Sequence, residues 1–193
     1  MSTATAPRGK LTAAEYLEFE RAADVRHEFF DGELFAMSGA SRKHILIVSN
    51  LARLIGNAIV ERPCELYLTE MRVRVEENGL YTYPDLSIVG AKPVFQDGHF
   101  DTLQNPEVLM EILSPSTEGY DRGRKFELYR ALPSLREYLM LAQDRVFAEH
   151  FTRLPDGTWN LRELHAGDRI VLPSAGCDFA LKEAYLKVFD PAA

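Results

Sequence analysis

Apolar residues recur at helical spacing between positions 41 and 60, the clearest periodic segment of the chain. Ser41 is well suited to cap a helix N-terminus, and Pro63 follows just beyond the last apolar position. The pattern therefore predicts an amphipathic helix over residues 41–60. Its expected apolar face consists of Ile45, Val48, Leu51, Ala52, Ile55 and Ile59.

Two shorter elements are expected before this helix. Residues 11–22 predict a short helix, because Thr12 and Glu15 have the spacing of a capping box. Residues 27–38 predict a β-hairpin, because the dipeptide Asp31-Gly32 lies between two apolar runs.

The middle of the chain contains strand-like and helical patterns in turn. From Met71 onward apolar and charged residues alternate as in a half-buried strand, and residues 108–113 form an apolar run broken only by Glu111. The other predicted elements are a strand at 85–89, a helix at 121–131, a strand at 137–142, a hairpin at 145–164 and a strand at 170–172.

This order of elements predicts one α/β domain over residues 11–193, after a disordered segment at 1–10. We expect a mixed central sheet flanked by the helices at 41–60 and 121–131, with additional N- and C-terminal β-hairpins. The strand at 108–113 should be central, because it is apolar on both faces.

The composition indicates the class of protein, its expected cellular compartment and its net charge. The 193 residues are 46% hydrophobic and 26% charged, which suits a globular domain with a sizeable core. We expect neither a secretory signal nor a membrane span, because no apolar run follows the start and no stretch approaches the roughly 20 apolar residues that cross a bilayer. Cys64 and Cys177 have no zinc-binding spacing, so we expect free thiols in a cytoplasmic protein. The net charge of −7 argues against charge-driven coating of DNA, although a metal site is itself acidic.

Two carboxylates stand out by their positions. Glu111 interrupts an apolar strand, where a charge is costly unless it is paired or binds a metal. Asp85 opens the neighbouring predicted strand directly after Pro84. Carboxylates on adjacent strands can point at one spot, and oxygen ligands of this kind suit Mg²⁺ or Mn²⁺. Either carboxylate could instead pair with an arginine or cap a loop.

The segments YPDLSIV, EILSPST and DRGRKFELYR, in this order, resemble the PD-(D/E)XK nuclease superfamily. Within it the chain is similar to the Uma-two family of restriction endonucleases, and the DGEL hairpin and a helix carrying His44 add to the likeness. The dipeptide PD alone carries little information, whereas the ordered set is specific. The resemblance implies a restriction-endonuclease-like core and a metal-dependent hydrolase that acts on nucleic acid.

By this resemblance Asp85 is the Asp of PD, and Glu111 is the acidic residue of (D/E)XK. The sequence departs from the simple pattern, because Leu113 stands where the lysine is expected. The resemblance implies that the following helix supplies the lysine, with Lys125 as the candidate, although Lys125 could also be an ordinary solvated lysine. Lys125 and Tyr129 are four residues apart and share one helix face.

A Mg²⁺ or Mn²⁺ ion held by Asp85 and Glu111 would stabilise the charge that develops in phosphodiester hydrolysis and lower the pKa of a bound water. Lys125 beside two carboxylates would stay protonated, so we expect an electrostatic role rather than general-base catalysis. His44 and Tyr129 are candidates for binding substrate, although a lone histidine is more often structural.

Few basic residues are placed to meet phosphates. Arg72 and Arg74 share the polar face of one predicted strand, while Arg122, Arg124 and Lys125 cluster on the later helix. The more ordinary alternative for both groups is a solvated face.

The sequence therefore predicts a metal-dependent endonuclease, with DNA as its expected substrate and Asp85, Glu111 and Lys125 as its catalytic core. We expect a homodimer, because cutting both strands of a duplex needs two sites. Glu28 and Glu33, which flank the predicted hairpin, are further candidates for lining the site. Two alternatives stay open: a non-catalytic nucleic-acid-binding or scaffold protein that retains the fold, and a small-molecule hydrolase that reuses it.

Overall fold

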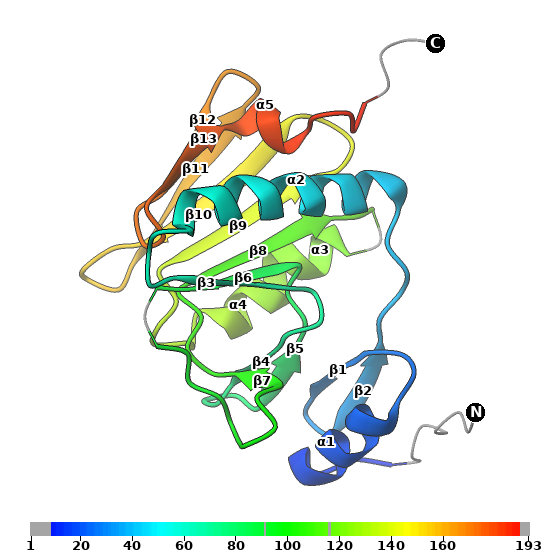
Figure 1. Ribbon diagram of the computed structural model, residues 1–193. Coiled ribbons are helices and arrows are strands. Elements are labelled where there is room, and N and C mark those ends of the chain that lie inside the picture. The colour runs from blue at the N-terminus through cyan, green and yellow to red at the C-terminus, as the bar shows by residue number, and fades with distance from the viewer. Residues whose placement is uncertain (1–8, 91, 116, 190–193) are drawn as a thin grey trace.

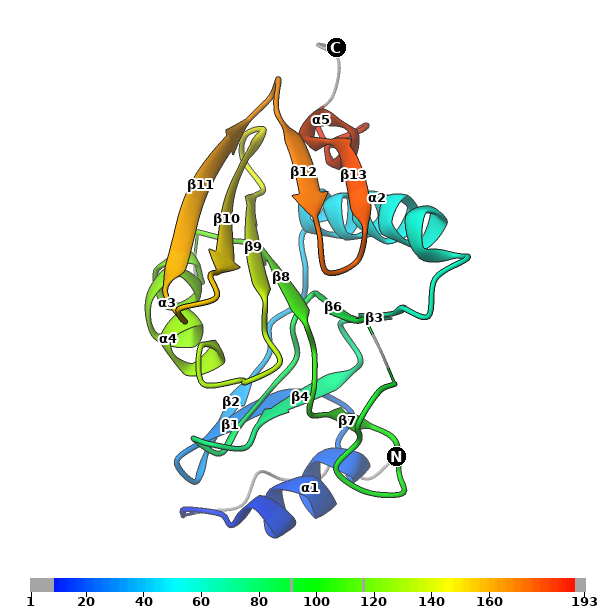
Figure 2. The ribbon, with the colours of Figure 1, turned by 90° about the vertical axis from the view of Figure 1, so that its left-hand side faces the viewer.

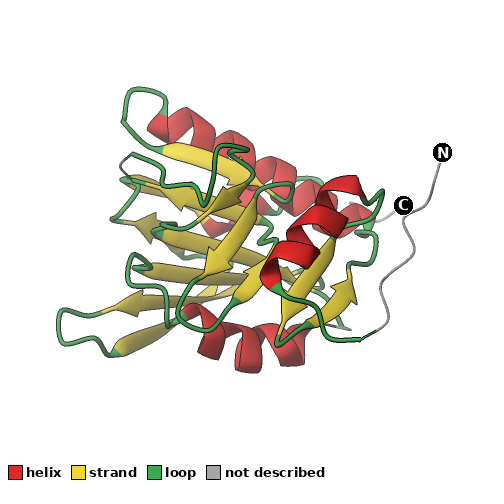
Figure 3. Ribbon diagram, turned by 90° about the horizontal axis from the view of Figure 1, so that it is seen from below, coloured by secondary structure: helices red, strands yellow, loops and turns green. Residues whose placement is uncertain are grey.

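The computed structural model describes residues 9–189 except 91 and 116. The disorder expected at residues 1–10 falls mostly on residues 1–8, which lie outside the described residues. Its strands form two sheets and a separate hairpin, with helices on opposite sides of the strands (Figures 1 and 3). The larger sheet has the order β11-β10-β9-β8-β6-β3. These strands are β3 (Glu65–Leu68), β6 (Leu86–Val89), β8 (Val108–Leu113), β9 (Glu137–Ala142), β10 (Phe147–Arg153) and β11 (Trp159–His165).

Strand β8 lies inside the larger sheet, as the apolar pattern predicted. It pairs parallel with β9 and antiparallel with β6, so the sheet is mixed, and all its residues are buried. Met110 belongs to the core on one face of the sheet, whereas Leu109 and Leu113 belong to the core on the other. Because side chains alternate along a strand, Glu111 points to the same face as Leu109 and Leu113.

Helix α2 (Arg42–Ile59) covers the first of these faces (Figure 1). The predicted helix is confirmed, and the Ser41 hydroxyl accepts a hydrogen bond from the His44 amide as its N-cap. The predicted apolar face was wrong at Ile45, which is 53% exposed. The inward-pointing side chains begin at Ile47 and recur every fourth residue, so Ile45 lies on the opposite side of the first turn. The buried residues are Ile47, Leu51, Ile55 and Ile59.

Short helical segments cover the second face. They are α3 (Glu118–Tyr120), a π-helical turn at Asp121–Lys125 and α4 (Phe126–Tyr129). The single α-helix predicted over residues 121–131 was therefore only partly correct, since its first half is π-helical. Such turns are rare and often lie at functional sites.

The smaller sheet has the order β2-β1-β5-β4-β7 and lies with α1 (Ala13–Ala22) in the lower part of Figure 1. The predicted capping box and hairpin are both present: Thr12 caps α1, and Asp31 and Gly32 have the positive φ angles of a tight hairpin turn. Tyr16 of α1 stacks on Phe29 of the hairpin with ring centroids 4.7 Å apart. The strands are β1 (His27–Phe30), β2 (Glu33–Ala36), β4 (Arg72–Val75), β5 (Leu80–Thr82) and β7 (Thr102–Leu103).

Two hairpins complete the chain toward its C-terminus. The predicted hairpin of β10 and β11 is confirmed, and the predicted strand β12 (Arg169–Leu172) pairs with β13 (Cys177–Ala180), which the sequence did not predict. The hairpin leads into α5 (Leu181–Ala184), which lies beside α2 (Figure 2). Among the described residues, no helix is long and apolar enough to cross a membrane.

Candidate active site

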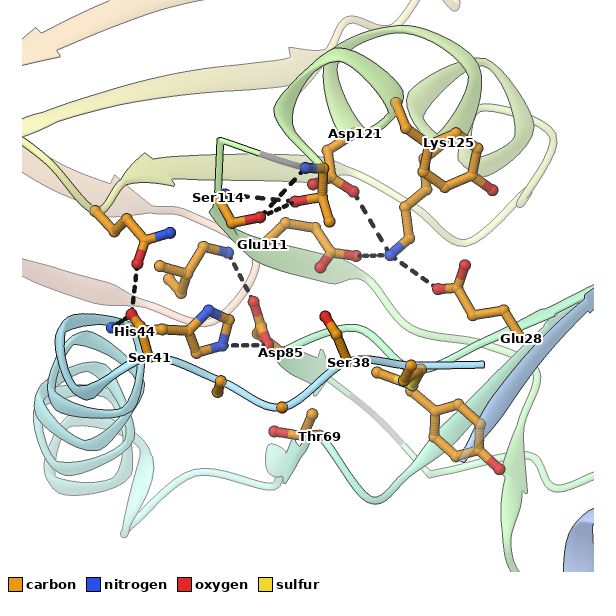
Figure 4. A pocket seen from close by; sticks show the side chains of 18 of the residues that line it. Glu28, Ser38, Ser41, His44, Thr69, Asp85, Glu111, Ser114, Asp121 and Lys125 are labelled. Atoms are coloured by element: carbon orange, nitrogen blue, oxygen red, sulfur yellow. Dashed lines mark hydrogen bonds and ion pairs between the residues drawn. The ribbon is translucent and has the colours of Figure 1, made fainter. Parts of the chain in front are cut away.

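A cleft of about 440 Å³ opens where the N-terminus of α2, the β1–β2 hairpin and the π-helical turn come together. Figure 4 shows its side chains converging from these elements and from β8. All three residues predicted as the catalytic core line this cleft, and so does His44. Its charged side chains and its histidine are Glu28, His44, Asp85, Glu111, Asp121 and Lys125.

Strand pairing brings Asp85 and Glu111 together. Leu86 of β6 is opposite Met110 of β8 in an antiparallel register, so the next residues outward, Asp85 and Glu111, are opposite each other. Both are buried, with exposed fractions of 6% for Asp85 and 5% for Glu111. The sequence expectation that these carboxylates meet across adjacent strands agrees with this register.

Asp85 is held in place through both of its carboxylate oxygens. Its Oδ2 accepts a hydrogen bond of 2.7 Å from the amide of Ile112, and its Oδ1 lies 2.9 Å from Nε2 of His44 (Figure 4). His44 stands in the first turn of α2, directly after the Ser41 cap, so the start of the helix fixes the position of the imidazole. His44 therefore contacts a site carboxylate directly.

Lys125 reaches the site from the π-helical turn. Its Nζ lies 2.9 Å from Oε1 of Glu111, 3.0 Å from Oε1 of Glu28 and 3.7 Å from Oδ1 of Asp121. The Tyr129 hydroxyl donates a 2.8 Å hydrogen bond to the same Glu111 oxygen. Lys125 is buried, so the alternative of a solvated lysine is wrong. Tyr129 is fully buried behind Glu111 and does not line the cleft, so its contact is with the carboxylate.

Two acidic residues of the cleft were absent from the predicted core. Glu28 was considered only as a lining candidate beside Glu33; it enters the site from β1 and also accepts a hydrogen bond from the Thr82 hydroxyl. Glu33 does not line the cleft. Asp121 was not considered, although its i, i+4 spacing from Lys125 is visible in the sequence and could have identified it.

The carboxylates outnumber the cations in this cleft. Burial raises the pKa of Glu111 to about 8; Lys125 opposes this shift, while the charges of Asp121 and Asp85 add to it. Burial also raises the pKa of Asp121. Burial by itself lowers the pKa of Lys125, but the surrounding carboxylates outweigh it and raise that pKa well above its ordinary value. Lys125 therefore stays protonated, and Glu111 holds a proton more strongly than a free carboxylate does.

This excess of negative charge fits a divalent cation. Four carboxylates face one lysine and one histidine, and all the carboxylate oxygens are hard donors of the kind that Mg²⁺ and Mn²⁺ take. Within the described residues no group of three or more His, Cys, Asp or Glu side chains is arranged to hold a metal ion by itself.

Arg72, one of the arginines considered as a phosphate-binding residue, lies outside the cleft lining. Arg72 is only 3% exposed and binds Thr102, Tyr83 and Asp101 inside the smaller sheet, so the expectation of a polar surface face was wrong for it. The strand carries Arg72 inward because its register puts that side chain under α1, where its guanidinium also lies 5.5 Å from the ring centre of Tyr16.

Comparison with known proteins identifies the relatives of this chain. A family model, Uma2, described as "Putative restriction endonuclease", matches residues 13–182. Two uncharacterized proteins of Synechocystis sp. (strain ATCC 27184 / PCC 6803 / Kazusa) are similar in sequence. The protein sll1609 is 38% identical over 154 residues, which are 80% of this chain and 87% of that protein. The protein slr1290 is 35% identical over 181 residues, which are 94% of each chain.

The fold is also that of a solved protein. A crystal structure described as "a putative nuclease belonging to DUF820", from Anabaena variabilis ATCC 29413, matches with a TM-score of 0.74 and 17% identity. The match covers 93% of this chain and 99% of that chain. The fold expected from the sequence, a mixed sheet flanked by helices, is thereby confirmed, and it is shared with that putative nuclease.

Proposed function

This chain belongs to the Uma2 family, described as "Putative restriction endonuclease", and from that premise we propose that it is a Mg²⁺- or Mn²⁺-dependent nuclease of the PD-(D/E)XK type. One observation carries the proposal: Glu111 lies in a cleft between Lys125, whose Nζ is 2.9 Å from its Oε1, and Asp85 on the neighbouring strand. Such a set of charges suits phosphodiester hydrolysis, because a cation held by the carboxylates and the lysine would both stabilise the negative charge that develops on the phosphate.

Asp85 and Glu111 would hold the cation. Asp85 is oriented for this by the Ile112 amide and by His44, in the way that hydrogen bonds to ligating carboxylates usually fix their direction. The cation, when bound, supplies Lewis-acid stabilisation of the phosphate charge and makes a water molecule more acidic.

Lys125 would stabilise the transition state by charge. Its pKa is raised by the surrounding carboxylates, against the effect of burial, so it does not serve as a general base at neutral pH. Glu28 and Asp121 keep its ammonium group at Glu111. Tyr129 would act through Glu111, as a donor that fixes the orientation of the carboxylate.

The start of α2 supports the binding of a phosphate in this cleft. Ser38, Gly39, Ala40 and Ser41 line it, and the first turn of α2 contains no acidic residue. The amides at the beginning of a helix of this length favour an anion.

The finer features of the proposal follow from the chemistry of duplex cleavage. We take DNA as the substrate and a homodimer as the working unit, because two centres are needed to cut two strands. The two free cysteines, Cys64 and Cys177, suit a reducing cytoplasm.

A plasmid-nicking time course tests the proposal. Wild type should nick DNA with Mn²⁺ and stop when the metal is chelated. Lys125→Ala, and Lys125→Met as a variant that preserves packing, should lose roughly a hundred- to a thousandfold in rate. Lys182→Ala is the matched control, because Lys182 is an exposed lysine on α5 outside the cleft. A wild type that cuts nothing under varied metal and DNA conditions would favour the non-catalytic binding or scaffold protein instead.

A further inference from the structure

Exposed aromatic side chains gather at the cleft. Among the described residues, the large hydrophobic side chains with substantial exposure include three aromatics: Phe35 at 49%, Phe100 at 66% and Tyr120 at 40%. Phe35 and Tyr120 both line the cleft. They come from different elements, β2 and α3, so two separate walls each present an aromatic ring. The two rings therefore give the cleft an apolar surface that a ligand reaching the buried carboxylates and lysine can cover.

The same cleft offers little free positive charge. Its described lining contains no arginine, and Lys125 is already paired with Glu111 and Glu28. Proteins that track a duplex take much of their affinity from lysine and arginine contacts to phosphates. Inside the described part of the cleft, contacts from lysine or arginine to several phosphates are therefore not available, whereas two exposed aromatic rings line it.

The burial of the proposed catalytic side chains also favours entry of a single strand into the cleft. Asp85, Glu111 and Lys125 are each no more than 6% exposed, so a phosphodiester has to enter the cleft to reach them. A volume of about 440 Å³ is that of a small-molecule pocket, which accommodates individual nucleotides rather than a double helix. A nucleotide can enter a pocket of this size only if it is unpaired or is extruded from the duplex, and extrusion costs unpairing and unstacking energy.

We propose that the cleft takes an unpaired segment of nucleic acid, with bases stacked on Phe35 and Tyr120 while the phosphodiester lies over Glu111 and Lys125. The proposal rests on the nuclease function above, and it narrows the DNA substrate from an intact duplex to an unpaired segment. Every base has a π-face, so this mode of binding prefers single strands without preferring a sequence. A duplex is then a substrate where it opens, at an end, a mismatch or a bubble.

Binding without cleavage tests this directly. Calcium replaces magnesium, and fluorescence anisotropy follows three labelled probes: a short single strand, the same sequence as a duplex, and an abasic strand with the same phosphates. Wild type should bind the single strand about tenfold more tightly than either other probe. Phe35→Leu should weaken binding of the single strand by about tenfold, and Phe35→Trp should preserve it. Phe100→Leu is the matched control, because that exposed ring lies outside the cleft.

The outcomes separate this proposal from the nuclease function. Equal or tighter binding of the duplex, equal binding of the abasic strand, or an unchanged affinity in Phe35→Leu would overturn the stacking proposal. If the stacking proposal is overturned in this way but DNA is cut in the metal-dependent assay, the nuclease function stands without the stacking proposal. If no probe is bound and nothing is cut, both proposals fail together.

Discussion

The two faces of strand β8 differ in what they contribute to the protein. On one face Met110 joins an apolar core that α2 covers with four buried aliphatic side chains. On the other face Glu111 stands between Leu109 and Leu113, and short helical segments bring it a lysine and a tyrosine. Adjacent residues of one strand thus serve packing and chemistry separately.

The comparison shows how a rigid support for a reactive group is obtained. A buried charge destabilises a fold unless it is compensated, so the face that carries Glu111 needs partners from distant parts of the chain. The opposite face needs only apolar residues of suitable size. Substitutions on the two faces should therefore separate activity from stability.

The largest effect is expected at the charged face. Glu111→Gln keeps the size of the side chain and an oxygen that accepts from Tyr129, but removes the ligand charge. The cleavage rate should fall by about a thousandfold while the melting temperature changes little. Glu127→Gln, an exposed glutamate of α4, is the control and should cut as wild type does. Full activity in Glu111→Gln would remove this residue from the proposed mechanism.

The apolar face should respond in the opposite way. Met110→Ala leaves a cavity under α2 and should lower the free energy of unfolding by about 2–5 kcal/mol, measured by urea titration. The molecules that remain folded should still cut, because Met110 points away from the cleft. Val60→Ala, at a position that is 74% exposed, provides the control. A loss of activity larger than the loss of folded protein would show that the two faces are coupled.

His44 connects the two faces, because it stands on α2 and contacts Asp85. His44→Ala should weaken metal binding or cleavage by about 10- to 100-fold, as expected when a residue that orients a metal ligand is lost. The exposed His99, substituted by alanine, is the comparison variant. If His44→Ala binds metal and cleaves DNA as well as His99→Ala does, the contact between His44 and Asp85 is only structural.

The smallest expected effect is a dependence of metal affinity on pH. Burial raises the pKa of Glu111 to about 8, so at neutral pH the carboxyl tends to hold a proton that a cation must displace. Affinity for Mg²⁺ should therefore rise with pH up to about 8 and then level off, and binding should release protons. Calorimetry in buffers of different ionisation enthalpy measures that release. An affinity that is flat between neutral and mildly alkaline pH would contradict it.

Local signals in the sequence predicted much of this structure. The capping box at Thr12 and the Asp31-Gly32 turn involve residues within three positions of each other, so their geometry is encoded where they stand. The apolar run around Glu111 likewise predicted a strand inside a sheet. Lys125 was found only through the family resemblance, since no periodic pattern distinguishes it from a solvated lysine.

The missing features depend on contacts that are distant in sequence. Glu28 enters the site because the smaller sheet brings β1 to Lys125, 97 positions further along the chain by their numbers, and no local pattern reports that pairing. The π-helical turn was missed because its residues also fit an α-helix. Arg72 alternates with apolar neighbours as a surface residue does, yet α1 covers it.

The central claim is that Asp85 and Glu111 hold one divalent cation, and Mn²⁺ titration by calorimetry tests it most directly. Wild type and Lys125→Ala should each bind one Mn²⁺ per chain, because the lysine adds charge without ligating the metal. Asp85→Asn should lose that binding while its melting temperature shows that it is folded. Absence of binding in wild type, or equal binding in wild type and Asp85→Asn, would contradict the account.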